Sequence, residues 1–236
     1  MSLSDNRRQA LENRIRTHVN DPEPCRELAR ELEADGALYD AARAQRLAAT
    51  RRPDRPWDHF LAARLTVAAD AQHQRNPKAP LPPEDTEDVR LPAAEEASIA
   101  LRVALELDPD FGAAHRELAR LDVGRARILR DEGQVKASAE RAVQRCQEAL
   151  KLDADDSETH RVLGDVQFHV LKAYPAARRH YARAIELAPD NADARAMLAA
   201  TFLREGDRET AFRELTHALS IAPEHELAHE ILKELR

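Results

Sequence analysis

Two segments far apart in the chain carry the same residue types at the same spacing. From Leu28, a glycine follows after 8 residues, alanines after 13 and 20, and a proline after 25. The same four steps begin again at Leu198 and end at Pro223. This feature constrains the fold more than composition does, because a repeated spacing of about 20 to 50 residues indicates stacked supersecondary units.

Further copies extend the pattern through the chain. One runs from Leu163 to Pro189 with one additional residue before its first alanine, and two others keep the pair of alanines seven residues apart. A step of 14 residues from the second alanine to the next leucine also recurs, at Ala104–Leu118, Ala149–Leu163, Ala184–Leu198 and Ala218–Leu232. The sequence therefore predicts five repeats, the second of which begins near Pro56 and uses Leu61-Ala62.

This spacing resembles the tetratricopeptide repeat (TPR), a unit of about 34 residues in which a tight turn joins two helices, A and B. Glycine permits the turn, and proline ends helix B. The abundance of Ala, Leu, Arg and Glu also favours helices. The resemblance implies an all-α fold, a right-handed superhelical TPR solenoid of helix–turn–helix repeats.

The predicted organisation has seven parts. These are an N-terminal capping helix at 1–21, TPR 1 at 22–55, TPR 2 at 56–111 with a Pro-rich insertion at about 76–91, TPR 3 at 112–156 with lengthened helices, TPR 4 at 157–191, TPR 5 at 192–225 and a C-terminal capping helix at 226–236. The first capping helix is expected to present Leu11, Ile15 and Val19 on one stripe. The Pro-rich insertion is interpreted as an exposed loop, with a polyproline ligand as the alternative.

Charge and composition exclude several classes of function. The net charge of −7 argues against a nucleic-acid binder, and no apolar run is long enough for membrane insertion. The N-terminal residues lack an apolar signal core, and Cys25 and Cys146 suggest no disulfide framework. We therefore expect a cytoplasmic protein.

The resemblance also implies a binding surface. In TPR arrays, residues two before and two after the recurring leucine face the concave groove formed by the A helices. The predicted partner-binding residues are Arg26, Arg30, His59, Arg116, Arg120 and Arg161. Arginine binds carboxylates through paired hydrogen bonds, so the expected partner is a protein with an acidic peptide or a carboxyl terminus. The alternative is that these arginines are neutralised by Glu27, Glu31, Glu117 and carboxylates of neighbouring repeats.

Some TPR proteins hold the C-terminal carboxylate of chaperones with a Lys/Asn set. The first repeat has Arg26 and Arg30 at those positions, and the fourth has Asp165 where the set needs an amide. The sequence therefore argues against a clamp of that kind.

The segment HELAH, at 225–229, matches the His-Glu-x-x-His signature of zinc proteases. A catalytic zinc needs a third protein ligand, but only seven residues follow His229, and Glu230 and Glu234 are the downstream candidates. His229 also falls at the repeat position of His115 and His160, which explains it without chemistry. A zinc hydrolase is thus a remote alternative, and we predict no enzyme and no catalytic, cofactor-binding or metal site.

The leading prediction is a non-catalytic adaptor or scaffold for protein–protein interaction. The alternative is a structural assembly unit, a homo-oligomer that associates through the extended hairpins of repeats two and three. A size measurement over a range of concentrations separates the two, because a strict monomer contradicts assembly.

Overall fold

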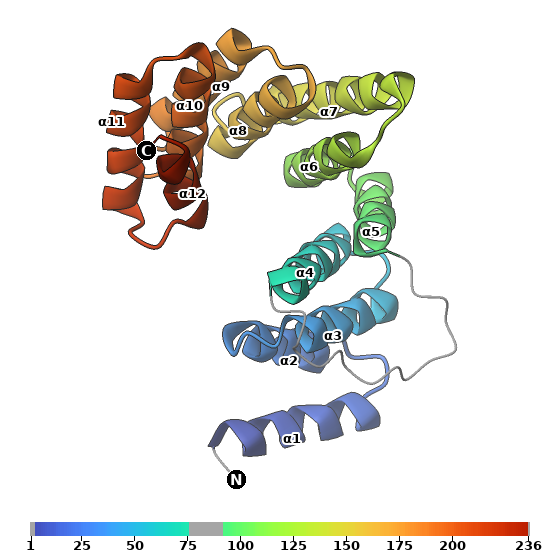
Figure 1. The fold of residues 1–236 in the computed structure, drawn as a ribbon. Helices are drawn as coiled ribbons and strands as arrows, with labels where there is room; N and C mark the ends of the chain where they lie inside the picture. The colour runs from blue at the N-terminus through green and yellow to red at the C-terminus, as the bar shows by residue number, and fades with distance from the viewer. Residues whose placement is uncertain (1–2, 76–91, 236) are drawn as a thin grey trace. The chain divides into compact units, whose positions relative to one another are not determined.

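The computed structural model of the chain describes residues 3–75 and 92–235 (Figure 1). Every regular element in these two ranges is a helix, which confirms the all-α prediction. The predicted Pro-rich insertion at about 76–91 lies outside the described residues. The chain divides into two compact units, 1–114 and 115–236, and each is described by itself.

The first unit is built from consecutive helices, each packed on the next. They are α1 (Leu3–Thr17), α2 (Glu23–Ala34), α3 (Leu38–Arg51), α4 (Pro56–Arg75) and α5 (Ala93–Leu107). Small residues fill the contacts between them, since Ala29, Ala41, Ala48 and Ala63 are at most 3% exposed. Alanine lets helix backbones approach closely and has the highest helix propensity, so one residue type serves both the helices and their packing.

The second unit contains most of α6 (Gly112–Ile128) and all later elements. These are α7 (Glu132–Leu152), α8 (Ser157–Asp165), the π-helical turn η1 (Val166–Val170), α9 (Tyr174–Leu187), α10 (Ala192–Glu205), α11 (Arg208–Ile221) and α12 (Glu226–Glu234). One buried cluster joins α6, α7 and α8, and a second joins η1 to the helices from α9 onward. The third predicted repeat has helices of 17 and 21 residues, whereas the fifth has two of 14.

Two recurring glycines close tight turns between paired helices. Gly36 and Gly206 adopt φ values of +75° and +88°, which side chains with a Cβ atom disfavour. The fourth repeat differs because its additional residue is absorbed by η1, a local widening of the helix. Lys172, with φ of +54°, then takes the left-handed position that glycine fills elsewhere.

Helices α1 and α12 lie at the two ends of the described chain. Leu11 of α1 is 3% exposed, and α1 packs on α2. The predicted stripe was wrong at Val19, because α1 ends at Thr17 and Val19 is 65% exposed. At the other end, Ala228 and Ile231 of α12 are buried against α10 and α11.

Candidate peptide-binding surface

A shared hydrogen bond fixes the register of four helix-A segments. In each, the side chain near the start of the helix contacts the backbone carbonyl oxygen six residues earlier, just before the helix begins. The pairs are His59–Pro53 at 3.0 Å, His160–Ala154 at 3.3 Å, Arg195–Pro189 at 3.1 Å and His229–Pro223 at 2.7 Å. In the last three of these segments, this side chain lies three residues before the recurring leucine.

The same bond corrects the register predicted for the second repeat. Because His59 occupies the position three before the leucine, Ala62 rather than Leu61 fills the leucine position. The predicted assignment of His59 to the groove position was one residue early. With the corrected register, the groove position two after the leucine is Arg64, whose guanidinium donates to Glu33 at 3.1 Å.

In the first unit, Arg26 is bound by the chain itself. Its Nε donates to Asp58 Oδ1 at 2.8 Å, a second guanidinium nitrogen pairs with Asp58 Oδ2, and a third pairs with Glu23. The side chains of Arg26 and Asp58 are 11% and 3% exposed, and Gln45 also donates to Asp58 at 3.1 Å. The hydrogen bond to Asp58 raises the pKa of Arg26, and its charge is already neutralised.

Beside this ion pair, helices α2 and α4 enclose a pocket of about 470 Å³. It is lined by Glu23, Arg26, Ala29, Arg30, Glu33, Gln45, Arg55, Trp57, Asp58, Leu61 and Leu65. Within the part of the chain that the structure describes, Arg30 and Arg55 have no ion-pair partner, and both are exposed. A pocket of this size is in the range of ligand sites, about 300 to 1,000 Å³.

Three aromatic rings hold one wall of the pocket in place. Trp57 stacks on Phe60 with ring centroids 5.2 Å apart and on Phe111 at 5.4 Å. Phe60 is 4% exposed, whereas Trp57, the single tryptophan of the chain, is 54% exposed. The stack therefore fixes Trp57 while leaving much of its indole ring accessible.

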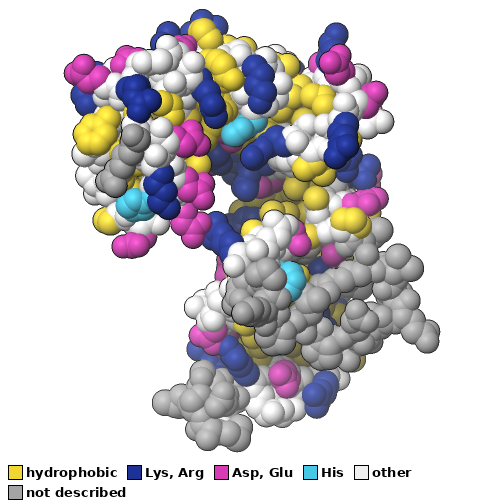
Figure 2. Space-filling view, in the orientation of Figure 1, with side chains coloured by type: hydrophobic (Ala, Val, Ile, Leu, Met, Phe, Trp, Pro, Cys, Tyr) yellow, Lys and Arg dark blue, Asp and Glu magenta, His cyan; other side chains and the backbone are white. Residues whose placement is uncertain are grey.

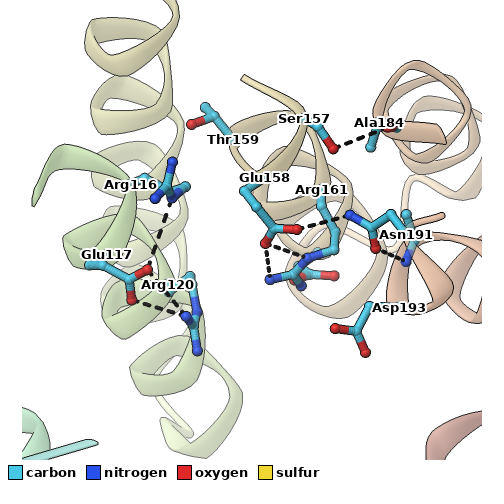
Figure 3. A network of polar contacts seen from close by, with 12 residues as sticks. Arg116, Glu117, Arg120, Ser157, Glu158, Thr159, Arg161, Ala184, Asn191 and Asp193 are labelled. Carbon is cyan, nitrogen blue, oxygen red and sulfur yellow. Dashed lines mark hydrogen bonds and ion pairs between the residues drawn. The ribbon is translucent and has the colours of Figure 1, made fainter. Parts of the chain in front are cut away.

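In the second unit, the corresponding arginines of α6 meet carboxylates. Arg116 donates to Asp156 at 2.6 Å across to the start of α8. Arg120 donates to Glu117 at 3.0 Å within α6 (Figure 3). Arg120 is 45% exposed and Arg116 is 21% exposed. Arg116 therefore stabilises the contact between two helices, while Arg120 keeps part of its guanidinium accessible.

Arg161 of α8 is also largely enclosed. It donates to Glu158 at 2.9 Å and to Asp165 at 3.0 Å, and its side chain is 14% exposed. Asn191, at the start of α10, donates to the other oxygen of Glu158 at 2.9 Å (Figure 3). Both carboxylates that bind Arg161 belong to α8, and the bond from Asn191 to Glu158 connects this network to the start of α10.

Asp165 receives a further bond from the core. The hydroxyl of Tyr181, which is fully buried, donates to Asp165 at 2.8 Å. Burial raises the pKa of Asp165, although the charge of Arg161 and the bond from Tyr181 oppose the shift. Burial, with the charge of Asp165, also raises the pKa of Tyr181. The pair is thus a structural link between α8 and α9.

The six predicted binding residues therefore separate into two groups. Arg26, Arg116 and Arg161 are enclosed and ion-paired, as in the alternative of neutralisation. Arg26 and Arg116 bind Asp58 and Asp156, which lie within or at the start of the next helix A along the chain, and Arg116 also lies 3.9 Å from Glu117. Arg161 binds Glu158 and Asp165 of its own helix. Arg30, Arg120 and His59 are more accessible, and among them Arg30 lines the pocket. Figure 2 shows basic and acidic side chains interspersed on the drawn face, without one dominant charge.

The arrangement of helices in this chain is similar to that in several solved structures. TTC0263, a thermophilic TPR protein in Thermus thermophilus, matches with a TM-score of 0.72 and 18% identity, over 91% of this chain and 98% of that chain. The chain has the tetratricopeptide-repeat fold. The TPR protein YrrB also matches, with a TM-score of 0.54 and 20% identity over 95% and 98% of the two chains.

A third similar structure is MamA 41-end from Desulfovibrio magneticus RS-1. It has a TM-score of 0.57 and 12% identity, over 87% of this chain and 97% of that chain. No protein-family model matches the sequence, and no curated protein matches it.

The TPR fold accounts for both histidines of the HELAH segment. His225 caps α12, because its Nδ1 accepts from the backbone of Ala228 at 3.1 Å while Nε2 lies 2.9 Å from Asp193. His229 makes the recurring contact with the carbonyl of Pro223. Residues 3–75 and 92–235 contain no group of three His, Cys, Asp or Glu side chains placed to hold a metal ion. The segment is therefore explained by repeat structure.

Three residues of the TPR surface escaped the sequence analysis. Arg64 was missed because the second repeat has alanine at its leucine position, although the step of 14 residues from Ala48 leads to Ala62. Arg55 and Trp57 lie before or at the beginning of α4, outside the two groove positions that the resemblance supplies. The available signal for them was the single tryptophan of the chain two residues after an arginine. Among the described helices, none is both long and apolar enough to cross a membrane.

Proposed function

We propose that this TPR chain is a non-catalytic protein-interaction scaffold that binds an acidic peptide of a partner protein. The binding site is the pocket between α2 and α4, and the expected location is the cytoplasm. One observation carries the proposal: Arg30 and Arg55 line a pocket of about 470 Å³ without an ion-pair partner among the described residues. Surface arginines without a counter-charge are available for carboxylates, to which their planar guanidinium binds bidentately.

Two further observations support the proposal. The pocket lies between the A helices of the first two predicted repeats, and repeat arrays bind partners on the surface that successive repeats create. YrrB, which shares the fold, is described as a TPR protein with an unusual peptide-binding site.

The experiment is a quantitative pull-down from the host lysate with three baits. These are the wild type, the Arg30→Glu/Arg55→Glu variant and an Arg16→Glu/Arg204→Glu control. The control reverses two exposed arginines outside the pocket, so that the change in net charge is the same. We expect a partner that the wild type and the control retain, that the pocket variant loses, and that higher salt weakens. Equal retention by all three baits would contradict the proposed site.

Charge reversal of Arg26, Arg116 and Arg161 tests the binding site less well than charge reversal of Arg30 and Arg55. Each of these side chains binds carboxylates of the chain itself, so a change to glutamate leaves buried like charges together. A lost partner would then report unfolding as readily as a lost contact.

Self-association through the extended hairpins is the second candidate. Ile128, at the end of α6 in the third predicted repeat, is 80% exposed. Leu171, in the turn between η1 and α9, is 46% exposed and lines a pocket together with residues of α7. Light scattering over a range of concentrations tests it with the wild type and Ile128→Glu. A dimer that Ile128→Glu abolishes would support this function, whereas a monomer at every concentration would contradict it.

A further inference from the structure

The pocket between α2 and α4 has an apolar part and a cationic part. Ala29, Leu61 and Leu65 line it together with the indole ring of Trp57, and Arg30 and Arg55 contribute the cationic groups. A ligand that uses the whole pocket must therefore present an apolar group and an anion close together.

The acidic side chains of the pocket do not neutralise these two arginines. Glu23 and Asp58 are both bound to Arg26. Glu33 binds the guanidinium of Arg64 at 3.1 Å. Arg30 and Arg55 thus remain available to an external anion in the part of the chain that the structure describes.

Trp57 determines the apolar half of the ligand. Its ring plane lies 27° to 30° from those of Phe60 and Phe111, and these two rings also contact each other with centroids 5.0 Å apart, so the three rings form one cluster that holds Trp57. Because 54% of Trp57 is exposed, one further ring can stack on it. Such offset-stacked aromatic pairs are favourable beyond the area they bury, and an ordered ring loses little conformational freedom when a ligand binds.

We propose that the pocket recognises an aromatic side chain directly beside a carboxylate side chain in an extended peptide. The aromatic ring stacks on Trp57, and the carboxylate binds Arg30 and Arg55. This inference rests on the proposed function and specifies its ligand. A phosphate alone would use the arginines but leave the ring platform unfilled, so the test includes inorganic phosphate.

Calorimetric titration of the full chain tests the proposal with three capped peptides. The first contains Asp-Phe-Glu between glycines, the second has Ala in place of Phe, and the third has Asn and Gln in place of the acids. We expect the first peptide to bind about tenfold or more tightly than either of the others. Arg30→Gln/Arg55→Gln and Trp57→Leu should each weaken its binding by a similar factor, whereas Arg16→Gln/Arg204→Gln should not. Circular dichroism melting of every variant verifies folding.

The outcomes separate this inference from the proposed function. If the peptide with Ala binds as tightly as the one with Phe, or if inorganic phosphate alone displaces the first peptide at low millimolar concentration, the aromatic–carboxylate specificity is overturned. If none of the peptides binds while the lysate partner still depends on Arg30 and Arg55, the specificity is again overturned and the scaffold function stands. If the lysate partner is also independent of these arginines, both fail.

Discussion

Arg26 and Asp58 join helices α2 and α4 through a buried two-pronged ion pair. Arg26 Nε donates to Asp58 Oδ1 at 2.8 Å, and the carboxylate also accepts from Gln45 on α3. The three side chains tie together helices of two successive repeats, next to the proposed pocket. The pair therefore positions the pocket and is not available to a ligand.

Removal of either member of this pair should destabilise the fold. Arg26→Ala leaves the buried carboxylate of Asp58 without its main partner, and Asp58→Ala leaves an enclosed guanidinium. We expect a loss of about 3 kcal/mol for each, the usual consequence of an uncompensated buried charge. Urea unfolding measures it, and the double variant should lose less than the sum of the two single changes.

Arg30→Ala is the matched control, because Arg30 lies one helical turn later on α2 and is exposed. It should change the stability by less than about 0.5 kcal/mol. Equal losses for Arg26→Ala and Arg30→Ala would contradict the structural role of Arg26.

Alanine substitution of two helical glycines should have opposite effects. A Cβ atom at Gly164 would lie 2.6 Å from Cδ1 and 2.8 Å from Cζ of the buried Tyr181 ring, whereas one at Gly124 meets nothing within 4 Å. Gly164→Ala should therefore cost about 1 to 3 kcal/mol by overpacking. Gly124→Ala should stabilise α6 by up to about 1 kcal/mol through helix propensity. Thermal melting of the two variants compares them, and a shift in the same direction would argue against the close contact of α8 with α9.

The free energy of unfolding should decrease at mildly acidic pH because the folded chain holds His169 in its neutral form. Burial, together with the positive charges of Arg127 and Lys172, lowers the pKa of His169 to about 4. In the unfolded chain the value is about 6.5, so between these two pH values the unfolded state binds a proton that the folded state does not. This contribution to stability is complete above pH 6.5 and is lost as the pH falls towards 4.

Urea midpoints at pH 7.5 and 5.0 measure the effect of His169. The decrease should be smaller in His169→Gln than in the wild type, whereas His18→Gln, an exposed control, should behave as the wild type. Identical decreases in all three proteins would contradict the assignment.

Both thiols should be unreactive in the folded protein. Cys25 and Cys146 are fully buried, and burial raises the pKa of each, that of Cys146 to about 12. Because the thiolate is the reactive form, a thiol reagent should modify the native chain at least about 100-fold more slowly than the urea-unfolded chain. Rapid reaction of a thiol in the native protein would contradict the burial of these helices.

The repeat spacing was enough to predict the helical hairpins, because alanine, glycine and proline at those steps have local physical roles. It failed in register at the second repeat, where Ala62 stands at the leucine position beside Leu61. Leu61 was assigned to the leucine position because it is the larger apolar residue. The contact of His59 with the carbonyl of Pro53 instead places Ala62 at that position.

The sequence could not show which of the predicted arginines form ion pairs within the chain. Asp58 lies 32 residues after Arg26, and Asp156 lies 40 after Arg116, so the ion pairs depend on how successive helices pack. The pocket has the same origin, because α2, α3, α4 and the loop before α4 all contribute to its lining. The sequence predicted an arginine-rich surface, and helix packing determines which of its arginines are already ion-paired.

The indole N–H resonance of Trp57 reports directly on whether a peptide binds in the pocket between α2 and α4. The chain has a single tryptophan, so a ¹⁵N-labelled sample gives one indole signal that reports on the pocket. On titration with the Asp-Phe-Glu peptide, we predict a saturable shift of this signal that is absent in Arg30→Glu/Arg55→Glu. A signal that stays fixed while backbone resonances outside α2 and α4 shift would contradict the account, because the peptide would then bind elsewhere.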